Sequence, residues 1–450
     1  MAEPRACPPS SAEGEVDSLT VQVGIILLVM VAAYGLTKWK FSVELSMLAT
    51  AIAGALAGAV VGTPHITQVA RHLVEGSFTY LDAVLIFVTA TIFMEIVNTS
   101  GGVTYIVQGI IRRFGRQRIV MLLLLMLVLL VPGALTGAGS VSLLVVGAPV
   151  ALALTALGIP KGKVSAILFI VAGLSAVAPP VNIWAMITCA GTAIPYVGFN
   201  LPLLVPVLLL GSFTVLFLGW KGKPGNLDGI MAEMPPVPAG MSWWRVALPF
   251  AVFFGLILAY RLWPFQIPIM GLPLQFVIAA IVALLVSPNR VNIFRLSLDT
   301  LKRLLPLLST MIIVGILQQV MTTTGVRGLL SFAVISTPLV LLFILLPIII
   351  PVSEGILTYG GAAVLGIPLV WFFDSLGLHA TVALAGMSLL WALGDGLPPT
   401  ALIGRLSMMM SKNEGSYRSF LKQTWVPWVV ITIVGVLMVV FSKELGFLVV

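Results

Sequence analysis

Charged residues are scarce in this chain. They make up 9% of its 450 residues, whereas a soluble domain has roughly 25%. Hydrophobic residues reach 59%, and the mean hydropathy is +1.13. No charged residue occurs from Ile119 to Pro160 or from Val164 to Trp220. Because uncharged apolar runs of about 18 or more residues are typical of membrane spans, the sequence predicts an all-α polytopic membrane protein.

Cysteine and histidine are also scarce, with two cysteines and three histidines. Two distant cysteines, Cys7 and Cys189, provide neither a disulfide framework nor a cysteine metal site. The histidines lack the spacing of metal ligands, and the His-Glu-x-x-His motif of zinc peptidases is absent. We therefore expect no cofactor and no enzyme activity.

The net charge of +8 does not indicate a nucleic-acid partner. The basic residues lie in short clusters between apolar segments, where the positive-inside rule places them. The expected environment is the lipid bilayer. The segment 1–17 is acidic and lacks the basic region of a cleavable signal peptide, so we expect the first span to be retained.

A half-length repeat built on proline and glycine runs through the chain. Eight positions of the first half recur in the second half, all at the same offset. The first set is Pro132, Gly147, Pro149, Leu157, Gly158, Leu174, Pro179 and Pro180, and the second is Pro351, Gly366, Pro368, Leu376, Gly377, Leu393, Pro398 and Pro399. Helix breaks repeated in two halves are typical of secondary transporters, whose binding site lies near the membrane midplane.

The repeat divides the chain into four parts. We predict a polar tail at 1–17, a first repeat at 18–220, a cytoplasmic Pro/Gly-rich linker at 221–243 and a second repeat at 244–450. Each repeat contains five predicted spans, one of them a broken helix, at 163–191 and at 380–407. The other predicted spans are 18–37, 43–62, 80–97, 199–220, 245–262, 267–287, 304–322 and 425–442.

Two further apolar stretches, 119–158 and 334–373, carry an interruption of small residues in their middle. The arm from Ile119 to Pro132 has 14 residues, or about 21 Å of helix, against about 30 Å for a hydrocarbon core. We therefore predict two re-entrant hairpins that enter and leave on one side. Two full spans joined by a glycine-rich turn are the alternative.

The charges predict the topology. With the N-terminus outside, 19 of the 24 basic residues lie on the inside. The first hairpin is flanked by basic residues at both ends and opens to the cytoplasm. The second is flanked by Asp374 and His379 and opens outward. Opposed hairpins are what an inverted repeat requires.

Several motifs follow each other in the order and spacing of a known family. They are Leu135–Ser142, Gly147–Pro149, Leu157–Gly158, Ala178–Val181, the upstream segment Ile92–Gly102 and the later loop Leu397–Thr400. Together they resemble the large membrane (permease) subunit of TRAP (tripartite ATP-independent periplasmic) transporters, over nearly the whole chain. The sequence departs from that family's pattern at Asn182 and Ile183 and at Pro351–Gly355.

This resemblance implies a sodium-driven elevator carrier in the bacterial inner membrane, with hairpins and broken helices forming a mobile transport domain. It further implies an organic anion substrate such as a carboxylate, a small membrane subunit and a periplasmic substrate-binding protein. A stand-alone ion-coupled anion carrier is the alternative. A remote alternative is an intramembrane aspartyl enzyme that uses Asp395 and Asp82. Glu95 is expected to be structural.

The helix breaks supply the candidate ligands, because unpaired backbone groups in lipid are costly unless they line a cavity. An intramembrane carboxylate costs about 2.5–3.5 kcal/mol and usually has a task, so Asp395 is a candidate for cation coordination or proton coupling. The sodium site that the resemblance implies is placed there. The candidate ion ligands are Val177, Pro179, Pro180, Ser353, Glu354, Gly394, Asp395 and Pro398. The candidate substrate ligands are Thr136, Gly137, Ser140, Ser142, Asn182, Thr358 and Thr400. Alternatively, each hydroxyl is satisfied within its own helix, and each acid lies in a wet interfacial loop.

Overall fold

The structure of the chain is a computed structural model that describes residues 10–61, 65–222, 231, 233–263, 265–268 and 270–449. Every regular element among the described residues is helical. Ten helices in this part of the chain are long and apolar enough to cross a membrane. The prediction of an all-α polytopic membrane protein is therefore confirmed.

The helices follow the chain in two series. The first comprises α1 (Ser10–Lys38), α2 (Val43–Val61), α3 (Ile66–Ser77), α4 (Leu81–Thr99), α5 (Gly102–Phe114), α6 (Arg118–Thr136), α7 (Gly139–Ser142), η1 (Leu143–Gly147), α8 (Ala148–Ala156), α9 (Lys161–Val177), α10 (Ile183–Thr192) and α11 (Asn200–Gly219). The second comprises α13 (Trp243–Leu262), α14 (Leu272–Val286), α15 (Ile293–Thr323), α16 (Val326–Ser336), α17 (Leu339–Leu357), η2 (Ala362–Gly366), α18 (Ile367–Ser375), α19 (Ala380–Gly394), α20 (Leu402–Met410), α21 (Tyr417–Val440) and η3 (Glu444–Leu448).

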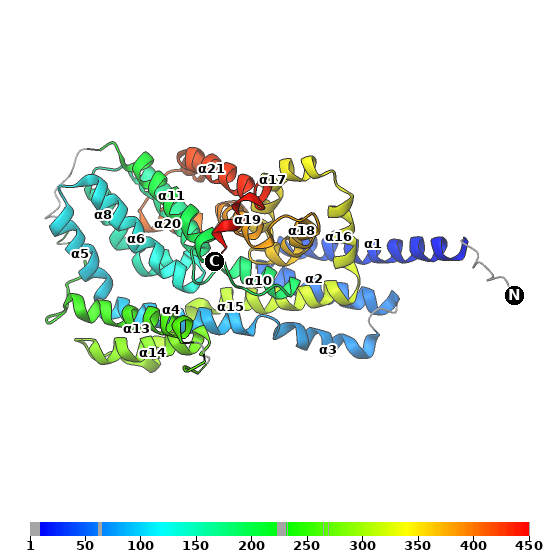
Figure 1. The fold of residues 1–450 in the computed structure, drawn as a ribbon, viewed down its shortest axis with the longest axis horizontal. Helices are drawn as coiled ribbons and strands as arrows, with labels where there is room; N and C mark the ends of the chain where they lie inside the picture. The colour runs from blue at the N-terminus through cyan, green and yellow to red at the C-terminus, as the bar shows by residue number, and fades with distance from the viewer. Residues whose placement is uncertain are drawn as a thin grey trace.

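The helices are arranged in two bodies (Figure 1). The first, which we call the frame, consists of α1–α4 and α13–α15; α15 packs against α2, α3 and α4, and α14 packs against α4. The second, the hairpin body, consists of α6–α11 and α17–α21, where α9 packs against α6, α11, α19, α20 and α21. Helices α5 and α16 connect the two bodies. α9 is therefore the central helix of the hairpin body, and its residues 164–177 are all buried.

The sequence repeat is accompanied by a repeat of local structure. The π-helical segment Leu143–Gly147 recurs as Ala362–Gly366, at the offset that relates Pro132 to Pro351. The Pro179–Pro180 and Pro398–Pro399 peptide bonds, at the same offset, are both cis. The two halves thus share not only residue types but also their departures from regular helix.

The predicted tail and linker fall partly on residues that the structure describes. Residues 10–17 of the predicted polar tail belong to α1, and residues 1–9 lie outside the described residues. In the predicted linker at 221–243, residues 223–230 and 232 also lie outside them. The following span begins at Trp243, where α13 starts.

Pro132 does not end the first arm of the predicted hairpin, contrary to expectation. α6 runs through it for 19 residues, from Arg118 to Thr136, which is about 28 Å of helix. Proline removes one helical hydrogen bond, and nearby the Ser142 hydroxyl donates to the carbonyl of Leu129. The short arm on which the hairpin prediction rested is therefore wrong. The chain nevertheless folds back after Thr136, because α7, η1 and α8 all pack against α6.

The ten apolar helices are not the ten predicted spans. Arg118–Thr136, Gly139–Ala156 and Leu339–Leu357, which were predicted as hairpin arms, are long enough to cross a membrane. In contrast, α14 and α19 have only 15 residues each. Apolar runs predict where helices lie, but turns and caps decide where they end. The lengths of individual helices were therefore predicted poorly.

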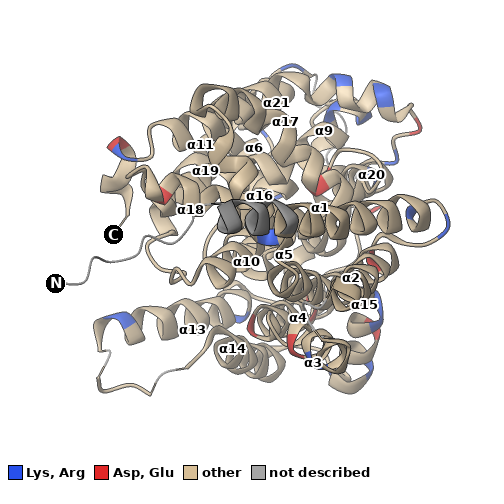
Figure 2. Cartoon of the chain, turned by 90° about the vertical axis from the view of Figure 1, so that its right-hand side faces the viewer, with Lys and Arg blue, Asp and Glu red and all other residues tan. Residues whose placement is uncertain are grey.

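Charged side chains are concentrated at the ends of helices. Figure 2 shows many of the lysines and arginines on one side of the molecule, near α9, α20 and the turn after α1. Glu95 in α4 is an exception, because it is only 6% exposed. Its Oε1 lies 2.9 Å from Nη2 of Arg303 in α15. This ion pair joins two long helices of the frame, in agreement with a structural role.

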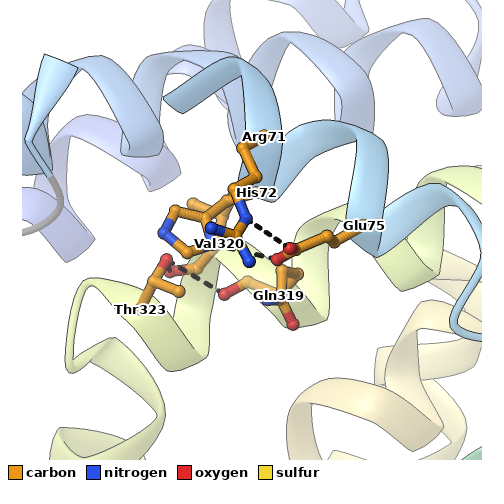
Figure 3. Close-up of polar contacts among 6 residues, drawn as sticks. All are labelled: Arg71, His72, Glu75, Gln319, Val320 and Thr323. Carbon is orange, nitrogen blue, oxygen red and sulfur yellow. Dashed lines mark hydrogen bonds and ion pairs between the residues drawn. The ribbon is translucent and has the colours of Figure 1, made fainter. Parts of the chain in front are cut away.

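Helices α3 and α15 cross at a contact between two glycines. A Cβ atom added at Gly315 would lie 2.4 Å from the Gly76 carbonyl oxygen. Beside this crossing, Glu75 of α3 pairs with Arg71, with 2.7 Å between Oε1 and Nε (Figure 3). That pair is exposed and contributes little to stability, whereas the glycine contact sets how closely the two helices approach.

Gly315→Ala should therefore destabilise the frame. The new methyl group meets backbone rather than a flexible side chain, and such overpacking costs about 1–3 kcal/mol. Gly255→Ala in α13 is the matched control, because nothing lies within 4 Å of a Cβ atom added there. Thermal unfolding of both variants in one detergent measures the difference. Equal melting temperatures would show that α3 and α15 are not held in this close contact.

Candidate functional site

The first helix break lies between α9 and α10, and its backbone groups are satisfied by two side chains. Asn182 caps α10, since its Oδ1 accepts from the Ala185 amide at 3.0 Å. Its Nδ2 donates to the Val177 carbonyl at the end of α9, at 3.3 Å. The Tyr196 hydroxyl donates to the Pro180 carbonyl at 3.3 Å and accepts from the Asn182 amide at 3.1 Å. Asn182, predicted to bind substrate, thus bridges the two half-helices.

Each break loop is hydrogen-bonded to the hairpin of its own half. The Val181 amide donates to the Ala134 carbonyl in α6 at 3.2 Å. In the second half, the Thr400 amide donates to the Gly355 carbonyl in α17 at 3.3 Å, and the Thr400 hydroxyl donates to the same oxygen at 3.0 Å. The donors Val181 and Thr400 occupy equivalent positions of the two repeats, and the acceptors differ by two positions. They make each hairpin and its break loop one unit.

The turns of the two hairpins meet each other. The Tyr359 hydroxyl donates to the Gly137 carbonyl at 3.4 Å, and the Tyr359 ring lies 5.7 Å from the ring of Trp184 in α10. A Cβ atom added at Gly137 would lie 2.7 Å from Ile183 Cγ1, just after the first break. The turn of the first hairpin, the turn of the second and the start of α10 therefore converge on one buried region.

Two carboxyl groups lie beside this region, in the second half. Glu354 in α17 is 1% exposed and Asp395, directly after α19, is 8% exposed. They are close enough to interact electrostatically. Gly394 permits this approach, because a Cβ atom there would lie only 2.4 Å from the Glu354 Cβ. Neither carboxyl forms an ion pair with any described residue.

Glu354 and the neighbouring Trp184 each carry a buried polar atom without a partner among the described residues. These atoms are the Oε2 of Glu354 and the indole Nε1 of Trp184. The indole N–H lies close to the Glu354 carboxyl group but does not meet the geometry of a hydrogen bond. Because an unpaired buried polar atom is costly, a cation or proton would satisfy the Glu354 oxygen, whereas the Trp184 N–H requires an acceptor such as a ligand oxygen.

Most of the predicted hydroxyl ligands are already engaged by backbone carbonyls. Thr136 donates to Pro132 at 2.8 Å, Ser353 to Ile350 at 2.7 Å and Thr358 to Leu357 at 2.6 Å. Ser142 donates to Leu129, as described above. Ser140, which is buried, makes no hydrogen bond through its hydroxyl within the described residues. For the engaged hydroxyls the structure therefore shows the alternative interpretation, satisfaction within their own hairpin.

Some of the loop carbonyls predicted to bind an ion already accept a hydrogen bond. Those of Val177 and Pro180 accept from Asn182 and Tyr196, as described above, and that of Gly394 accepts from the Leu397 amide at 2.8 Å. Pro179 and Pro398 precede the cis bonds of the two loops. The buried carboxyl pair, which forms no ion pair within the described residues, is the chemical centre of the candidate site.

Several residues of the site were missed in the sequence. Tyr359 and Trp184 follow the turn residue Thr358 and the cap residue Asn182 almost directly, so their position next to predicted ligands was the available signal. Arg405 was counted only as a topogenic charge. It is exposed in α20, and its Nη2 donates to the Pro399 carbonyl of the second break at 3.3 Å. It is thus a cationic side chain at a break loop.

The positions of the potential metal ligands and of the acidic residues bear on two alternatives, a metal site and an aspartyl enzyme. The described residues contain no group of three or more His, Cys, Asp or Glu side chains that could hold a metal ion. Asp82, which the remote enzyme alternative requires, is exposed in the first turn of α4, whereas Asp395 is buried. The carboxyl group that lies beside Asp395 is that of Glu354.

The comparisons with known proteins concern the fold. The sequence matches no protein-family model and no curated protein. Its structure is similar to the crystal structure of the Alcanivorax borkumensis YdaH transporter, described as having an unusual topology, with a TM-score of 0.54 and 12% sequence identity. The match covers 90% of this chain and 98% of that chain. The chain thus has a transporter-like membrane fold, and the narrower resemblance to a TRAP subunit stays a prediction.

The backbone at Thr358 yields a test of the hairpin turn. Thr358 has a φ of 52°, a conformation that costs a residue other than glycine about 1–3 kcal/mol. Thr358→Gly should relieve this strain and raise the free energy of unfolding by about 1 kcal/mol. Thr358→Ala removes the hydroxyl but keeps the strain, so it should not be stabilised. Equal unfolding free energies of the two variants would contradict a strained turn.

Proposed function

We propose that this chain is a secondary active transporter that couples a cation gradient, of sodium in the first instance, to the movement of a small organic anion. The observation that carries the proposal is the buried pair of Glu354 and Asp395, which has no cationic partner among the described residues. It lies where the hairpin turns and helix breaks converge. The transporter-like fold supports the same conclusion.

A cation offsets the cost of burying the two carboxylates. One carboxylate at mid-membrane costs about 2.5–3.5 kcal/mol on insertion scales, and two neighbouring ones repel each other. Sodium or a proton between them removes most of the repulsion and halves the buried net charge. The C-terminal ends of α9 and α19 point to the breaks and carry partial negative charge, which also favours a cation there.

The anion is proposed to bind at the same two breaks, at the positive N-terminal ends of the helices that follow them. The N-terminal ends of α10 and α20 begin at the break loops and carry partial positive charge. Arg405, hydrogen-bonded to the Pro399 carbonyl at 3.3 Å, is positioned to add a full charge on the second loop. A carboxylate is the substrate group that this combination of amides and guanidinium recognises best.

An elevator mechanism accounts for the division into two bodies. Lys38 at the end of α1 donates to the Ile356 carbonyl in the second hairpin at 3.3 Å. Pockets of about 830 Å³ and 490 Å³, lined mainly by apolar side chains, separate frame helices from the hairpins α17 and α6. Loose apolar packing at this boundary supports movement of the hairpin body, with both hairpins and both breaks, past the frame.

The proposed setting is the bacterial inner membrane. The resemblance to TRAP subunits suggests a small membrane subunit and a periplasmic substrate-binding protein as partners. A carrier that acts alone is the second candidate, because the solved structure of similar fold is named simply a transporter. Uptake of candidate carboxylates into proteoliposomes, with and without a sodium gradient and a binding protein, separates the two.

Asp395→Asn should abolish the sodium dependence of uptake while the protein stays folded. The amide cannot supply the charge that holds the cation, but it preserves the shape of the side chain. Asp374→Asn is the matched control, because Asp374 is an exposed carboxylate at the end of α18. Uptake rates against sodium concentration in proteoliposomes provide the measurement. An unchanged sodium dependence in Asp395→Asn would show that Asp395 is only a solvated loop acid.

Gly137→Val tests whether the meeting point of the turns is the transport site. Gly137 and Gly377 have similar positive φ values of 73° and 75°, so a side chain costs about 1–2 kcal/mol at either. Only at Gly137 would it also press on Val181 and Ile183, since nothing lies within 4 Å at Gly377. We expect Gly137→Val to insert into the membrane and lose uptake, and Gly377→Val to retain it. Equal uptake by both variants would place the site elsewhere.

A further inference from the structure

Three lysines on separate helices converge on one surface pocket of the hairpin body. Lys163 lies in the first turn of α9, Lys221 follows the end of α11, and Lys422 lies near the start of α21. All three line a pocket of about 670 Å³. Since α9, α11 and α21 pack against one another, the pocket is formed by tertiary structure rather than by one cluster in the sequence.

The charge of this pocket is not balanced. No aspartate or glutamate lines it among the described residues, and none of the three lysine ammonium groups forms an ion pair or hydrogen bond in that part of the chain. Three uncompensated positive charges around one cavity call for a polyvalent or membrane-bound anion. The positive-inside rule explains why lysines lie on this side, but not why they share one pocket.

The remaining lining has the character of a membrane interface. Trp220 and Trp425 flank the lysines and are 60% and 63% exposed, the position in which tryptophans anchor proteins at the headgroup level. Below them, Phe217 and other apolar residues of α11 continue the pocket along the helices. A basic rim above an apolar groove matches a phospholipid, with its phosphate at the rim and an acyl chain in the groove.

The internal repeat provides a comparison within the molecule. At the offset that relates Pro132 to Pro351, the positions equivalent to the three lysines are occupied by Val382, Val440 and Leu203. The fold of a repeat therefore does not require lysine at these places. The basic pocket is an addition on one side of the molecule only, as expected for binding to one leaflet.

We propose that this pocket is a binding site for an anionic membrane phospholipid, held by Lys163, Lys221 and Lys422 through its phosphate and by the α11–α21 groove through its acyl chain. The lipid would contact α9, the first half of the broken helix. The proposal does not depend on the transport function, because lipid binding is measured directly on the purified protein.

Native mass spectrometry of the delipidated protein tests the site, with phosphatidylglycerol and phosphatidylcholine of identical acyl chains as probes. We expect phosphatidylglycerol to bind preferentially. A lysine near an anionic headgroup contributes about fivefold in affinity, so the triple variant Lys163→Gln, Lys221→Gln, Lys422→Gln should bind on the order of 100-fold more weakly. Arg112→Gln, Arg113→Gln, Arg116→Gln is the control, because it removes three exposed charges outside the pocket and should change affinity less than about twofold.

Several results would overturn the proposal. Equal binding of both lipids would show a merely apolar groove, and displacement of phosphatidylglycerol by millimolar inorganic phosphate would show a soluble-anion site. A change of oligomeric state in the triple variant, without loss of lipid, would show a protein interface. If the triple variant does not fold, Lys422→Gln alone decides the matter, because this residue is exposed and its loss should weaken binding about fivefold.

Discussion

The burial of two carboxyl groups without a cation of their own is the constraint on which the site depends. Glu354 and Asp395 lie in the apolar hairpin body, 1% and 8% exposed, where a charge is expensive and two like charges are more so. No described basic side chain compensates them. In the proposed function a bound cation or proton compensates them, and its release is then energetically linked to any rearrangement of the surrounding loops. That linkage is the physical basis of the proposed ion coupling.

The surrounding structure brings these groups together through small residues and broken helices. Gly394 lets α17 and α19 approach closely enough for the carboxyl groups to interact. The hydrogen bonds from Val181 to Ala134 and from Thr400 to Gly355 attach each break loop to its hairpin, so a change at one loop moves its hairpin turn. Tyr359, bonded to the Gly137 carbonyl, then connects the two halves.

The sequence predicted the architecture better than the roles of side chains. Paired prolines and the half-length repeat indicated the breaks, because proline removes a helical hydrogen-bond donor. The same rule placed a helix end at Pro132, where α6 in fact continues. Hydroxyl roles were not predictable, since Thr136 can satisfy a carbonyl of its own helix or a ligand equally well. Trp184 and Tyr359 were missed, because their significance arises only when distant segments meet.

Direct binding of radioactive sodium to the purified protein tests the central claim that Glu354 and Asp395 together hold the coupling cation. We predict saturable sodium-22 binding that weakens as pH falls, because protons compete for the same carboxylates, and that disappears in Glu354→Gln although the variant unfolds at the temperature of the wild type. Saturable binding of equal affinity in Glu354→Gln would contradict the account, and so would the absence of both sodium binding and proton uptake by this pair.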